Sequence, residues 1–156
     1  MPFILFKFLH VFTMFVAVAS AVVPEIVLHQ VARSNSVPAT RVVADYAARI
    51  GKLLPVFFIG GAIFGLIAAA TGQLDFFKPW LIAAYVVFVI AMVTGATVTG
   101  PWAGRMAAAA AASPDNAASP ELTATIHEGR AMVASAILLS SIAVIIFLMV
   151  VKPGNG

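Results

Sequence analysis

The sequence predicts an all-α membrane protein, a four-helix transmembrane bundle with up-down topology. The first observation is composition: 62% of the 156 residues are hydrophobic and 10% are charged, whereas soluble domains contain about 25% charged residues. The second is that apolar residues gather in four stretches, 3–23, 55–71, 79–99 and 131–151, each roughly long enough to cross a hydrocarbon core about 30 Å thick. Spans joined mostly by short connections pack as antiparallel neighbours, here in a single transmembrane domain over residues 1–156.

The composition also excludes several function classes. The chain contains no cysteine, so disulfides, thiolate ligands and thiol chemistry are excluded. Its net charge of +3 is scattered over loop ends, a pattern typical of charges that orient a membrane protein, so no nucleic-acid partner is expected. No phosphate-binding loop, nucleophile elbow, HExxH motif or carboxylate dyad is present. The catalytic residues, if there are any, are therefore unknown from the sequence.

The first span is expected to cover about residues 3–33, because Pro24 can kink a helix without ending it. Its beginning also has the features of a secretory signal: Lys7, an apolar run, and small residues at 19–21. Cleavage there would leave Arg33 and the basic residues after it outside, against the positive-inside rule. We therefore expect the segment to remain as a transmembrane helix.

The second span is expected over about residues 52–71, after an amphipathic segment at 39–54. In this segment Arg41, Asp45 and Arg49 follow one another at intervals of four residues, so Asp45 can pair with either arginine. We expect the segment to lie at the membrane interface and to lead into the span.

Small residues recur every four positions in the second span and in the third, which is expected over about residues 79–99. Such stripes let two helix backbones approach closely. We expect helix–helix contacts along both: Gly61, Gly65 and Ala69 in the second span, and Ala91, Gly95 and Thr99 in the third.

A long loop is expected over about residues 100–129, before the fourth span at about 130–151. Within it, the alanine run 107–112 is helix-prone. Ser119, followed by a proline and a glutamate, has the pattern of an N-cap that starts a new helix.

Lysine and arginine counts predict the orientation. The loops after the first and third spans carry most of the basic residues: Arg33, Arg41, Arg49, Lys52, Arg105 and Arg130. The opposite side has only Lys7, Lys78 and Lys152. Both loops are therefore expected in the cytoplasm and both termini outside it.

His10 stands inside an apolar span, where an ionisable residue is costly and is by default a candidate functional site. His29 lies 19 residues later in the same helix, about 28 Å away at 1.5 Å per residue, so the two histidines cannot bind one centre. Three interpretations of His10 remain open. It is an axial haem ligand, with Met149 as the soft side chain at matching depth; it belongs to a proton or quinone relay; or it is a neutral imidazole hydrogen-bonded to a neighbouring helix.

A second group of polar residues is expected near the cytoplasmic side. Glu25 and His29 share one helix face, and His127 and Glu128 precede the last span. Together they could form a metal site with nitrogen and oxygen ligands, although their spacing does not require one. The alternative is that they are solvated interfacial residues that form salt bridges with Arg33 or Arg130.

Several segments resemble a family of predicted bacterial integral membrane proteins of unknown function: FKFLHVFTMF, PWLIAAYVVF, TGPWAGRM, SPEL and FLMVVKP. The resemblance spans nearly the whole chain and implies a multi-pass protein of the bacterial inner membrane. The Lys-x-x-His start is also similar to the four-helix CopD copper-resistance group and to HemJ-type protoporphyrinogen oxidases, whose first-helix histidine is linked to haem. This likeness implies haem b at His10, with Lys7 as its neighbour.

Two function classes follow from the sequence. The first is a small membrane protein that binds haem b or a metal through His10. The second is a non-catalytic membrane subunit or scaffold that acts through helix packing. The expected partners are the lipid bilayer and either further copies of the chain or a membrane complex.

Overall fold

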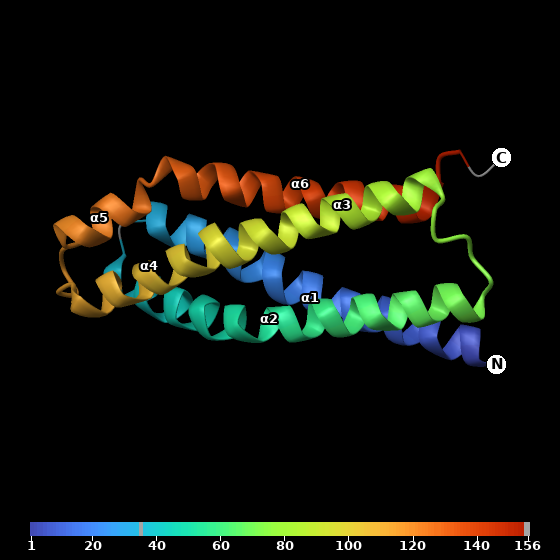
Figure 1. The fold of residues 1–156 in the computed structure, drawn as a ribbon. Coiled ribbons are helices and arrows are strands. Elements are labelled where there is room, and N and C mark those ends of the chain that lie inside the picture. Colours follow the sequence, from blue (N-terminus) through green and yellow to red (C-terminus); the bar gives the residue numbers. More distant parts are fainter. Residues whose placement is uncertain (35, 155–156) are drawn as a thin grey trace.

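The computed structural model describes residues 1–34 and 36–154, and within them all regular structure is helical (Figure 1). The elements are α1 (Pro2–Arg33), α2 (Val37–Thr71), α3 (Pro79–Thr94), the π-helix η1 (Gly95–Thr99), α4 (Gly100–Ala112), α5 (Pro120–Ile126) and α6 (Gly129–Val151). Four helical runs are long and apolar enough to cross a membrane: α1, α2, α3 with α4, and α5 with α6. The predicted all-α, four-helix membrane fold is confirmed.

Local signals explain where several helices begin. The Ser36 hydroxyl accepts a hydrogen bond from the Ala39 N–H at 3.4 Å and caps α2. The Ser119 hydroxyl likewise accepts from the Leu122 N–H at 3.1 Å, directly before a proline at the first position of α5. Each side-chain oxygen satisfies an amide that has no partner within its helix. The predicted N-cap at Ser119 is therefore confirmed.

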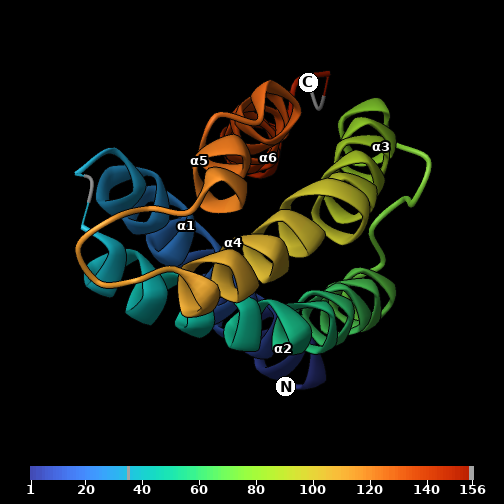
Figure 2. The same cartoon turned by 90° about the vertical axis from the view of Figure 1, so that its left-hand side faces the viewer.

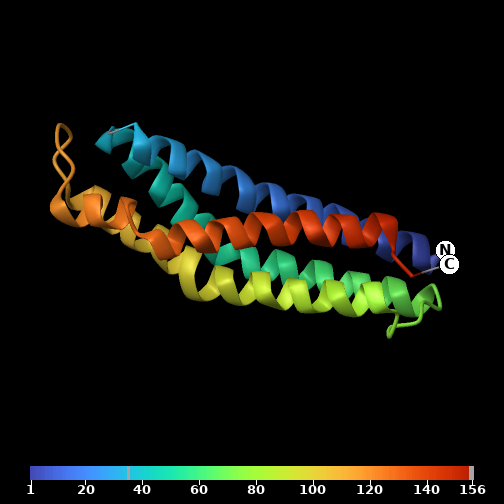
Figure 3. The same cartoon turned by 90° about the horizontal axis from the view of Figure 1, so that it is seen from above.

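The transmembrane half of the molecule consists of two helix pairs. Viewed from one end, α1 lies beside α2, and α3 lies beside α6 (Figure 2). Contacts between the two pairs are few in this half. Both chain ends lie at the same end of the bundle (Figures 1 and 3), as an even number of spans requires.

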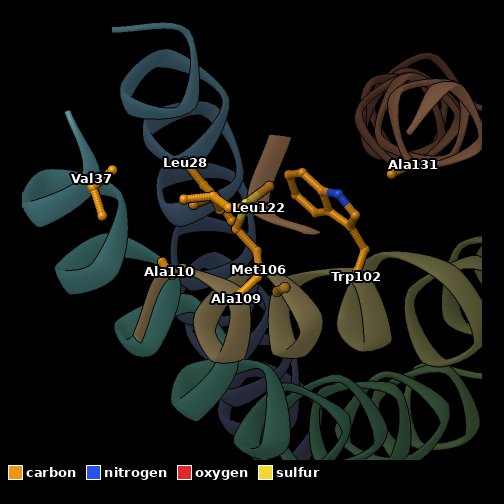
Figure 4. Close-up of a cluster of buried hydrophobic side chains, with 10 residues drawn as sticks. Leu28, Val37, Trp102, Met106, Ala109, Ala110, Leu122 and Ala131 are labelled. Carbon is orange, nitrogen blue, oxygen red and sulfur yellow. The ribbon is translucent and has the colours of Figure 1, made fainter. Parts of the chain in front are cut away.

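The other end forms a helical cap. At 1.5 Å per residue, the 32 residues of α1 extend about 48 Å, well beyond a hydrocarbon core of about 30 Å. The helical cap consists of residues 24–33, 37–54 and 100–126. Its core is a cluster of buried side chains (Figure 4): Leu28, Val37, Ala44, Trp102, Ala103, Met106, Ala109, Ala110, Leu122 and Ala131.

The helical cap corrects one expectation. Residues 39–54 do lead directly into the second span, as the first half of the continuous helix α2, which runs through Pro55. Residues 100–129 are not a long loop, because α4 and α5 occupy most of them. The alanine run favours helix, and the burial of Trp102 and Met106 against α1 and α2 makes that helix part of the core.

Candidate functional site

His10 points from α1 toward α2. Its Nδ1 lies 2.7 Å from the backbone carbonyl oxygen of Gly61, and because a carbonyl only accepts, the Nδ1–H donates. A Cβ atom at Gly65 would lie 2.7 Å from the same nitrogen, so the ring occupies the space that the missing side chain leaves. The expected contact along this small-residue stripe is confirmed, and the neighbouring helix that it meets is α1.

The other residues expected near His10 have different contacts. Lys7 places its Nζ 5.8 Å from the centre of the Phe3 ring. Met149 packs against a buried cluster around Trp80 and Leu81 of α3. The structure therefore brings His10 to the backbone of α2, whereas it brings Met149 to α3.

The hydrogen bond to Gly61 determines the tautomer of His10. With the proton on Nδ1, a neutral imidazole carries its lone pair on Nε2. No hydrogen bond to Nε2 occurs within residues 1–34 and 36–154. The ring can therefore offer Nε2 as a ligand atom or as a proton acceptor while Nδ1 stays bonded to the neighbouring helix.

A second polar site lies where the cap meets the transmembrane half. The Ser135 hydroxyl of α6 donates to Oε1 of Glu25, a residue with 9% exposure. Nε2 of His29 lies 3.1 Å from the same hydroxyl oxygen and 3.5 Å from Oε1 of Glu25. The serine thus joins a carboxyl group and an imidazole of α1 to α6.

This arrangement differs from that of a catalytic triad. In a triad the acid bonds one ring nitrogen and the serine bonds the other. Here Glu25 and Ser135 both approach Nε2 of His29, so the ring is not aligned between an acid and a nucleophile. Ser135 is hydrogen-bonded to both side chains, and the resulting Glu25–His29–Ser135 cluster stabilises the contact between α1 and α6.

Trp102 of α4 forms one wall of this site. Its ring stacks on His29 with centroids 4.9 Å apart and 22° between the planes. Its indole N–H donates to the Thr125 carbonyl oxygen at 2.9 Å, so the buried nitrogen is satisfied. Trp102 therefore connects His29 to α5.

The sequence analysis missed Ser135 and Trp102 as partners of His29. The available signals were weak: Ser135 is a hydroxyl in an apolar span, and Trp102 lies in the TGPWAGRM segment. Neither signal identifies the helix that the side chain meets.

The structure does not group the four residues of the predicted metal site. His127 donates from Nδ1 to the carbonyl of Thr123 at 2.8 Å, and Glu128 pairs with Arg105 at 2.6 Å. In the described part of the chain, no group of three or more histidine, cysteine or acidic residues is arranged to hold a metal ion. Glu25 and His29 instead contact Ser135 of α6. The alternative of four solvated residues is also wrong for Glu25, which is buried.

Comparison with known proteins gives one assignment. The model of the family described as "Predicted integral membrane protein (DUF2269)" matches residues 4–153. No curated protein and no solved structure matches the chain. These comparisons support a membrane family of unknown function, and they show no relationship to the CopD group or to HemJ-type oxidases.

Proposed function

The chain belongs to the DUF2269 family of predicted integral membrane proteins, and on that premise we propose that it binds haem b, or a metal ion, through His10 in a bacterial inner membrane. The observation that carries the proposal is the hydrogen bond from Nδ1 of His10 to the Gly61 carbonyl. Histidines that bind metals usually donate their other ring N–H to such an acceptor, which fixes the tautomer and the ring orientation. His10 has this arrangement.

The two side chains proposed as haem ligands, His10 and Met149, differ in how well their positions fit that role. His10 offers Nε2 and is held by two helices, as haem ligands in helical bundles are. Met149 contacts the Trp80 cluster of α3, so its role as a second axial ligand stays a prediction. Bound haem b would supply one-electron redox chemistry. The protein's own contribution is to orient the ring through the Nδ1 hydrogen bond to Gly61 and to hold it against Gly65.

The test is an absorption spectrum of protein purified from haem-replete cells, with metal analysis of the same sample. We expect a Soret band in the wild type that is lost in His10→Ala and retained in His127→Ala, a matched control because His127 is exposed and bonds only within its own helix turn. If Met149 is the second ligand, Met149→Leu shifts the band while preserving most of the packing volume. Purified wild-type protein that contains neither haem nor metal would contradict the proposal. A Soret band that is unchanged in His10→Ala would also contradict it.

The packing of His10 favours one alternative function, a non-catalytic subunit or scaffold. The ring fills the space at Gly65 and joins α1 to α2, which is a sufficient structural role. Large apolar side chains also remain exposed along the spans, among them Phe8, Phe12 and Phe15 of α1, where another membrane protein or lipid would cover them. This alternative predicts no Soret band and a defined complex, with itself or a partner, after extraction in a mild detergent.

A further inference from the structure

A groove runs along the outside of the molecule, with α3 and η1 on one side and α6 on the other. It consists of two hollows of about 400 and 440 Å³ that share Val133 and Ile137. Other side chains along it are mainly aliphatic, including Val87, Ile90 and Val98. The groove is therefore suited to a long apolar ligand.

The length of the groove matches one leaflet of a bilayer. Its lining on α6 extends from Arg130 to Val144, about 21 Å along the helix at 1.5 Å per residue. Half of a hydrocarbon core about 30 Å thick is about 15 Å. A groove of this length is long enough for an extended acyl chain and also reaches the depth of the lipid headgroup.

The end of the groove next to the helical cap carries a positive charge. Arg130 lines this end and is exposed. It forms no ion pair within the described residues, because the nearest acidic side chain in sequence, Glu128, pairs with Arg105. An arginine without an acidic partner beside an apolar groove is available for a phosphate group, which guanidinium binds with two parallel hydrogen bonds.

The helix opposite Arg130 is distorted. Within η1 the chain forms one π-helical turn, closed by a hydrogen bond from the Gly100 N–H to the Gly95 carbonyl. Thr97 and Val98 of this turn line the groove. Single π-turns occur frequently at functional sites, because the wide turn changes the direction of the side chains.

We propose that this groove binds an anionic phospholipid, with the headgroup phosphate at Arg130 and one acyl chain along α3 and α6. The charge at the mouth, the aliphatic lining and the length of one leaflet all fit this occupant. Arg130 also lies at the start of α6, beside the helical cap that carries the other arginines, where anionic lipids of the cytoplasmic leaflet are attracted. The site is separate from His10 and from the Glu25–His29–Ser135 cluster.

Native mass spectrometry of delipidated protein in detergent tests the proposal, with phosphatidylglycerol and phosphatidylcholine added as competing probes. We expect the wild type to retain phosphatidylglycerol in preference to phosphatidylcholine. Arg130→Gln should weaken phosphatidylglycerol binding about fivefold, the effect of removing one cation near an anionic headgroup. Arg49→Gln is the matched control, because Arg49 lies on α2 and pairs with Asp45.

The apolar part of the site needs its own variant. Ala136 is exposed and lines the groove, so Ala136→Phe should reduce the retention of both lipids by filling the space. Ala70→Phe, at an exposed position of α2 outside the groove, should leave retention unchanged. Equal retention of the two lipids by the wild type overturns the proposal. So does an equal effect of Arg130→Gln and Arg49→Gln, or normal lipid binding by Ala136→Phe.

Discussion

Neighbouring glycines of α2 occupy very different environments. A Cβ at Gly65 would lie 2.7 Å from the ring of His10, whereas a Cβ at Gly61 would lie 3.1 Å from the Met14 side chain. Gly60 has nothing within 4 Å of the same position. A methionine can move to another rotamer, but His10 is held by its hydrogen bond to Gly61. The three positions therefore differ in how much a methyl group costs.

We expect Gly65→Ala to lower the free energy of unfolding by about 1–3 kcal/mol, the usual cost of overpacking. Gly61→Ala should cost less, and Gly60→Ala should be neutral or stabilising by up to about 1 kcal/mol because alanine favours helix. Thermal unfolding in detergent measures all three. The cost of Gly65→Ala should shrink in a His10→Ala background. Equal melting temperatures for Gly65→Ala and Gly60→Ala would mean that the α1–α2 contact is looser than described.

The elements of the cap are joined by Arg41, near the beginning of α2. Its guanidinium donates to the carbonyl oxygens of Ala110 at 3.0 Å and Ser113 at 2.7 Å. It also donates to Asp115 at 2.8 Å. These acceptors lie at the end of α4 and just beyond it, where carbonyls have no partner within the helix. One side chain thus fixes the start of α2 against the end of α4.

Arg41→Lys should lower the free energy of unfolding by about 1–3 kcal/mol, because an ammonium group cannot reproduce three bonds in a planar fork. Arg49→Lys is the matched control: Arg49 makes one exposed ion pair with Asp45, and its change should stay within about 0.5 kcal/mol. Amide hydrogen exchange should also rise at the end of α4 in Arg41→Lys alone. Similar effects of both substitutions would remove the special role of Arg41.

For the molecule as a whole, the two ends differ in charge. The helical cap and its edges carry Arg33, Arg41, Arg49, Lys52, Arg105 and Arg130, while the end with both termini (Figure 3) has Lys7, Lys78 and Lys152. By the positive-inside rule, the cap should face the cytoplasm and the termini the opposite side.

A reporter enzyme that is active only outside the cytoplasm, fused after residue 156, should therefore be active. A reporter that fluoresces only in the cytoplasm should give no signal at the same position. An expressed fusion with the reverse pattern would invert the proposed orientation and place the cap outside.

The sequence by itself determined the membrane class, the four spans, the N-cap at Ser119 and the close helix–helix contact at Gly65. These features depend on local composition, helix propensity and spacing along one helix, all of which are properties of short segments. It also showed that His10 and His29 cannot share one centre, because both lie in a single helix.

Only the tertiary structure decided which helices meet. Ser135 lies 106 residues from His29, and their contact depends on how α1 and α6 are rotated about their axes, which apolar helix sequences specify weakly. The same holds for Arg41 and the end of α4, and for the groove between α3 and α6. The residues of the predicted metal site show the same dependence: they share one end of the molecule, but Glu25 and His29 contact Ser135 of α6.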